Sequence, residues 1–122
     1  MDLSILKLQD NGNPSLEVLI LSVDIDTNLN GYAVCDNTYI SGTTNLSNER
    51  RNFFWFPNKG VKAGELVALW TRPGKYCNVT NKAGKVVHYF HWGLSNGVWN
   101  NTGDLAILIE IAAYDRRVVN KV

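Results

Sequence analysis

Short apolar runs separated by turn-forming residues constrain the fold of this chain more than any other feature. No long stretch keeps apolar residues at the helical spacing i, i+3, i+4 and i+7, and the runs are rich in β-branched and aromatic residues. Gly, Asn or Pro bounds them, as in Asn11-Gly12-Asn13-Pro14 and Arg72-Pro73-Gly74. The predicted strands lie near 3–8, 16–23, 31–40, 52–56, 65–71, 86–92, 105–111 and 114–119. We therefore predict an all-β fold, arranged as a sandwich or a barrel.

Length and composition indicate one globular domain over residues 1–122. Hydrophobic residues make up 45% of the chain and charged residues 19%, which is typical of folded proteins. Twelve basic and 11 acidic side chains leave a formal net charge of +1. A charge this small gives no field that would attract nucleic acid or an anionic membrane, so binding to nucleic acid is not expected.

The N-terminal residues Met1 to Ser15 form neither a signal peptide nor a membrane span. As written, the chain is expected in the cytosol, whereas removal of a leader would leave secretion open. The two cysteines, Cys35 and Cys77, could pair, but they are too few for a disulfide framework and form no CxxC motif. We expect them to be buried thiols.

The segment from Lys85 to Asp104 contains His88, His91 and Trp92, which raises the question of a metal site. Side chains alternate between the two faces of a strand, so histidines three residues apart point to opposite sides of a sheet. A bulge and Asp104 could complete a site, but no thiolate pair or further histidine lies nearby. We expect no metal. The same alternation predicts that Val86, His88, Phe90 and Trp92 face the core while Val87, Tyr89 and His91 face outward.

No pattern in the sequence indicates catalysis or a cofactor. Neither cysteine lies in a local nucleophile motif, and the G-x-S-x-G pattern at Gly93–Gly97 is followed by no helical pattern of the kind that a nucleophile elbow requires. Phosphate-binding GxxxxGK[ST] and GxGxxG loops are absent from the sequence as well. Asp24 and Asp26 share a strand face, but they lie where the strand ends, as solvated carboxylates commonly do. We expect no catalytic residues and no cofactor.

Several motifs occur in a recognisable order along the chain. They are Leu29-Asn-Gly-Tyr-Ala-Val34, Asp36, Phe54-Trp-Phe-Pro57, Val61-Lys-Ala-Gly-Glu-Leu-Val-Ala-Leu-Trp70 and Val98-Trp-Asn-Asn-Thr-Gly-Asp104. This order resembles the lamin tail domain family over about residues 16–119. The family typically shows an L-x-G-[WY]-x-[LV] strand, an aromatic-x-F-P corner, an apolar-x-x-G-[EGQ] turn and a W-N-x-x-G-[DE] turn.

The resemblance implies an immunoglobulin-like β-sandwich of about eight or nine antiparallel strands. It further implies a non-catalytic interaction or assembly module of the stand-alone kind found in bacteria. Trp70 and Trp99 would pack in or at the rim of the core. Because the coiled-coil rod of nuclear lamins is not seen in this sequence, we do not expect nuclear-lamina partners.

Two classes of partner remain open. Residues 66–70 and 105–111 are apolar on both strand parities, which favours a sheet face that binds another protein or a second copy of the chain. The alternative is a carbohydrate-binding sandwich that uses exposed aromatic side chains. The candidate ligand contacts are Trp55, Tyr89, His91 and Trp92, with Tyr32 and Trp99 as further stacking candidates. An open groove that aligned Trp55, Tyr89 and Trp92 would favour a sugar.

Overall fold

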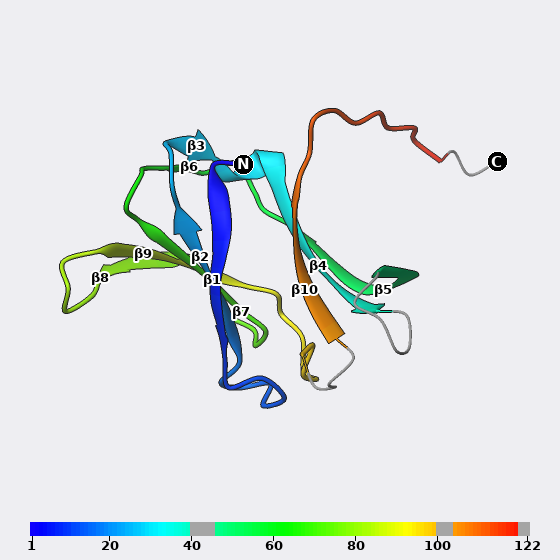
Figure 1. Ribbon diagram of the computed structural model, residues 1–122, viewed down its shortest axis with the longest axis horizontal. Coiled ribbons are helices and arrows are strands. Elements are labelled where there is room, and N and C mark those ends of the chain that lie inside the picture. Colours follow the sequence, from blue (N-terminus) through cyan, green and yellow to red (C-terminus); the bar gives the residue numbers. More distant parts are fainter. Residues whose placement is uncertain (40–45, 100–103, 120–122) are drawn as a thin grey trace.

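Two β-sheets lie on the two sides of the hydrophobic core in the computed structural model, which describes residues 1–39, 46–99 and 104–119 (Figure 1). Five strands form one sheet in the order β1-β2-β7-β9-β8, and three form the other in the order β10-β4-β5. A short β3-β6 pair stands apart from both. The strands are β1 (Leu3–Gln9), β2 (Val18–Val23), β3 (Thr27–Asn28), β4 (Tyr32–Tyr39), β5 (Leu46–Trp55), β6 (Gly60–Val61), β7 (Leu66–Trp70), β8 (Cys77–Thr80), β9 (Val86–His91) and β10 (Asp104–Glu110).

Alternation along the strands builds the main core. Leu19 and Leu21 of β2 and Leu69 of β7 point inward and are almost completely shielded from solvent. From the opposite sheet, Val34 of β4 packs into the same cluster. Burying apolar side chains from both sheets removes their surface from water, and this burial holds the two sheets together.

The prediction of an all-β fold is confirmed. Within the described residues the helical element is one 3-10 turn, Leu29–Gly31. No helix of the described part is long and apolar enough to cross a membrane. Phe90 and Trp92 face the main core and Tyr89 faces outward, as alternation along 86–92 predicts.

Purely antiparallel pairing, which the family resemblance implied, is wrong for one pair. β7 and β9 run parallel, with Leu66 opposite Val87 and Trp70 opposite His91. Between them the chain runs back as β8, which pairs antiparallel with β9 at the edge of the sheet. β9 therefore returns in the direction of β7 and fills the position between β7 and β8.

The strand predicted at 114–119 is also wrong, because these residues belong to no sheet and are exposed. β8 has the opposite outcome: no strand was predicted for Cys77–Thr80, which is exposed at all four positions. Cys35 is buried on β4 and Cys77 is exposed on β8, so the two form no disulfide. The expected burial of Cys77 is therefore wrong.

Candidate functional site

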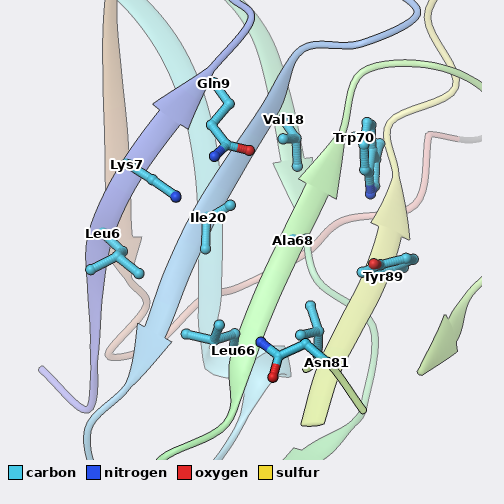
Figure 2. A pocket seen from close by; sticks show the side chains of 11 residues that line it. Leu6, Lys7, Gln9, Val18, Ile20, Leu66, Ala68, Trp70, Asn81 and Tyr89 are labelled. Atoms are coloured by element: carbon cyan, nitrogen blue, oxygen red, sulfur yellow. The ribbon is translucent and has the colours of Figure 1, made fainter. Parts of the chain in front are cut away.

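The outward face of the five-stranded sheet is hollowed by an apolar groove of about 290 Å³ (Figure 2). It is lined by Leu6, Lys7, Gln9, Val18, Ile20, Leu66, Ala68, Trp70, Asn81, Val87 and Tyr89. We refer to this set as the outer groove. Its residues come from β1, β2, β7, β9 and the turn that follows β8.

The floor of the outer groove follows from the unusual composition of β7. Val67 and Leu69 face the main core, while Ala68, on the opposite parity, is buried in a second cluster on the outward face. Val18 and Val87 complete this cluster from the neighbouring strands. The expectation that 66–70 is apolar on both faces is thus confirmed, and small side chains at the centre of the sheet leave the floor recessed.

Aromatic side chains form one wall of the outer groove. Trp70 and Tyr89 meet edge to face with their ring centroids 6.1 Å apart. The Arg72 guanidinium lies 4.1 Å from the centre of the Trp70 ring, a cation–π contact that holds the indole upright. The Trp70 indole nitrogen is buried and has no hydrogen-bond partner within the described part of the chain.

A β-bulge brings a polar wall to the opposite side. The register between β1 and β2 shifts between Ile5 and Lys7, so that Leu6 and Lys7 both line the groove. Figure 2 shows Lys7 and Gln9 reaching from β1 toward the floor, across from Trp70 and Tyr89. The groove thus combines an apolar floor, an aromatic wall and a cationic side chain.

The four aromatic residues expected as ligand contacts lie at separate places. Tyr89 lines the outer groove, and His91 is half-buried beside it against Gly74, where an added Cβ would lie 2.5 Å from the ring. Burial lowers the pKa of His91 and the charge of Arg72 lowers it further, against a backbone contact with Arg72 that raises it. Trp92 packs against Trp99, which is buried in the main core.

Trp55 lies on the other sheet, half-exposed at the end of β5. Its indole nitrogen donates to the Asn30 carbonyl at 2.7 Å, and its ring meets Tyr114 edge to face. The structure therefore brings only Tyr89 and His91 near one another. Lys7, Gln9 and Asn81 were not anticipated as site residues, because a bulge and a turn place them there and neither leaves a periodic signal in the sequence.

A chain of hydrogen bonds joins Tyr76, His88 and Glu65 at the opposite face of β9. The Glu65 carboxylate can only accept, so His88 Nε2 donates to it at 2.9 Å, and His88 Nδ1 accepts from the Tyr76 hydroxyl at 2.8 Å. Both ring nitrogens of His88 are thus engaged. Burial raises the pKa of Glu65, but hydrogen bonds from His88 and the Lys62 amide outweigh it and the pKa is lowered overall.

These three side chains follow the order hydroxyl, imidazole base and carboxylic acid, as catalytic residues can. Here, however, the two hydrogen bonds are a structural link. Asn78 also donates to the Tyr76 hydroxyl, at 3.3 Å. None of the three residues lines the outer groove or the smaller polar hollow of about 230 Å³ formed by Asn52 and Leu94–Gly97. In the described ranges no group of three or more His, Cys, Asp or Glu residues could hold a metal ion.

Glu17 is a buried carboxylate that ties loops together. Its Oε2 accepts from the Thr71 hydroxyl at 2.7 Å and from the backbone amides of Val98 and Trp99 at 3.0 and 3.3 Å. Its Oε1 accepts from the Gly12 amide at 3.2 Å. These donors replace the water that the fully shielded carboxylate has lost, so the interaction is structural.

Comparisons with family profiles, with curated proteins and with solved structures find no match for this chain. The motifs that carry the resemblance fall at strand boundaries. Leu29–Val34 runs from the 3-10 turn into β4, Phe54–Pro57 ends β5, and Gly64, at φ +90°, turns the chain into β7. Residues 100–103 of the last motif lie outside the described residues.

Proposed function

We propose that this chain is a non-catalytic interaction module, an immunoglobulin-like β-sandwich of lamin-tail type, that binds a partner protein through the outer groove. The observation that carries the proposal is the recessed apolar floor formed by Val18, Ala68 and Val87 on the outward face of a sheet. A sheet face without a covering layer is normally polar, and an apolar hollow with a few polar groups at its edge is the usual form of a binding site.

A protein segment suits this groove better than a sugar does. Carbohydrate binding needs an aromatic ring whose face is open to the ligand, whereas Trp70 and Tyr89 stand edge to face at 71° and Arg72 covers the indole. Of the aromatic residues Trp55, Tyr89 and Trp92, only Tyr89 lines the outer groove. An apolar side chain of a partner, by contrast, would replace water over Ala68 and contact the floor directly.

The experiment is a selection of random peptides of about 12 residues, displayed on phage, against the immobilised protein. Affinities of the selected peptides are then measured for the unmodified protein and for Ile20→Glu, which places a carboxylate on the groove floor. Ile107→Glu is the matched control, because Ile107 is also half-buried but lies on the other sheet, on the side of β10 opposite the core residues Ala106 and Leu108.

We expect the selected peptides to bind Ile107→Glu as they bind the unmodified protein and to bind Ile20→Glu at least about tenfold more weakly. Circular dichroism and thermal unfolding of both variants establish that they are folded. Recovery of no peptide, or of peptides that bind a folded Ile20→Glu equally well, would contradict the proposal.

A further inference from the structure

Three cationic residues lie in or beside the outer groove. Lys7 extends over the groove from β1 (Figure 2), and the Arg72 guanidinium stacks on the Trp70 ring. Lys85 lies at the end of the groove beside Asn81, because its backbone amide donates to the Asn81 side-chain oxygen at 3.0 Å. Lys7 and Lys85 are exposed, and Arg72 is partly exposed.

The carboxylates nearest in sequence to this face lie beyond its strands, where Asp24, just after β2, accepts from the Ser22 hydroxyl at 3.2 Å. The five strands of the sheet, as bounded above, contain no aspartate or glutamate, and Lys7 is their one lysine or arginine. Glu17, just before β2, is buried and satisfied by the donors described above, and Glu65, just before β7, is paired with His88. Lys7, Lys85 and Arg72 make no ion pair with any residue of the described part.

From this juxtaposition we propose that the outer groove recognises a protein segment in which an apolar side chain is flanked by aspartate or glutamate. The inference rests on the proposed function and names the chemistry of its partner. The apolar side chain would occupy the floor over Ala68 between Tyr89 and β1. The flanking carboxylates would meet Lys7 on one side and Arg72 or Lys85 on the other, since complementary charges at a rim select partners and speed their encounter.

The same charges disfavour a second copy as the occupant. A two-fold contact sets a patch against itself, which would bring the cationic rim of one chain onto the cationic rim of the other. A bilayer is disfavoured by shape. Val18, Ala68 and Val87 are each less than 10% exposed and lie below the rim, where a single side chain can reach them and a flat lipid surface cannot.

The test uses the peptides recovered from the random library, together with two matched charge reversals. Lys7→Glu alters the rim of the groove, and Arg117→Glu makes the same change of charge at an exposed position that follows β10. We expect the selected pool to be enriched in Asp and Glu next to large apolar residues. Affinity should fall about five- to tenfold in Lys7→Glu, stay within about twofold in Arg117→Glu, and weaken between about 50 and 500 mM NaCl.

A selected pool that depends on the groove but is neutral or basic, or that binds Lys7→Glu unchanged, overturns this inference and leaves the proposed function standing. Failure to recover any groove-dependent peptide overturns both. Two further arms identify other occupants, and either positive result also overturns the inference. One is binding to phosphatidylcholine–phosphatidylserine vesicles that Ile20→Glu abolishes. The other is a dimer in light scattering that Ile20→Glu disrupts.

Discussion

At the scale of single residues, buried polar groups explain how loops without regular structure keep their positions. The Glu17 side chain links the Gly12 turn, Thr71 after β7 and the Val98–Trp99 segment. A buried carboxylate is costly unless donors surround it, and here each oxygen has at least one. Glu17 therefore joins these loops, together with the Asn11 side chain, which donates to the Trp99 carbonyl at 3.3 Å.

Glu17→Ala should lower the free energy of unfolding by about 3 kcal/mol, because it leaves the Thr71 hydroxyl and the buried amides of Val98 and Trp99 without their acceptor. Urea unfolding followed by circular dichroism measures this change. Asp24→Ala is the control, since Asp24 is exposed and accepts only from Ser22, and its effect should stay within about 0.5 kcal/mol. Equal effects of the two substitutions would show that the Glu17 contacts do not organise the fold.

The pair Glu65–His88 gives the stability a dependence on pH. The pKa of Glu65 is lower in the folded chain than its ordinary value of 4.5, so unfolding at acid pH takes up a proton at this residue. The stabilisation that the ionised Glu65 gives the folded chain is fully present at pH values above its ordinary pKa of 4.5. It is lost as the pH falls through the lower pKa that Glu65 has in the folded chain. Unfolding by urea should therefore show Glu65→Gln less stable than the unmodified protein at neutral pH, with the difference shrinking at acid pH. A difference independent of pH would contradict this assignment.

Among the secondary-structure elements, the strand predictions were correct where buried apolar residues recur at every second position. Residues 16–23, 65–71 and 86–92 correspond closely to β2, β7 and β9 because each has apolar residues at positions that pack on a core. β8 escaped prediction because Cys77–Thr80 is exposed throughout and pairs only as an edge. The strand prediction at 114–119 was wrong because the β-branched Val118 and Val119 favour a strand intrinsically, whereas no strand of the described part pairs with them.

A chain ending at Tyr114 tests the status of this C-terminal run. Residues 115–119 are exposed and unpaired in any sheet, so removal of the segment after Tyr114 should change the free energy of unfolding by less than about 0.5 kcal/mol. Tyr114 is kept because its ring contacts Trp55. Chemical denaturation of the two chains provides the comparison. A loss of 2 kcal/mol or more would show that the run pairs as a strand after all.

For the whole molecule, the all-β class could be predicted from the sequence, and the position of the outer groove could be predicted only in part. Because residues 66–70 are apolar on both strand parities, the sequence indicated that both faces of β7 pack against other side chains. The rim could not be predicted, because Lys7 depends on the β1 bulge and Arg72 on a stacking contact that arises only after folding. The net charge of +1 is a sum over the whole chain, so it could not predict that the strands of the five-stranded sheet carry no carboxylate.

A nuclear magnetic resonance titration that follows the indole N–H signals of the four tryptophans tests our proposal that a partner binds in the outer groove. The ligand is the tightest peptide recovered from the random library. Trp70 is part of the groove wall, whereas Trp55 lies on the opposite sheet with its N–H bound to Asn30. We expect the Trp70 signal to shift with added peptide while the Trp55 signal stays in place. A shift of the Trp55 signal with an unchanged Trp70 signal would overturn the proposal.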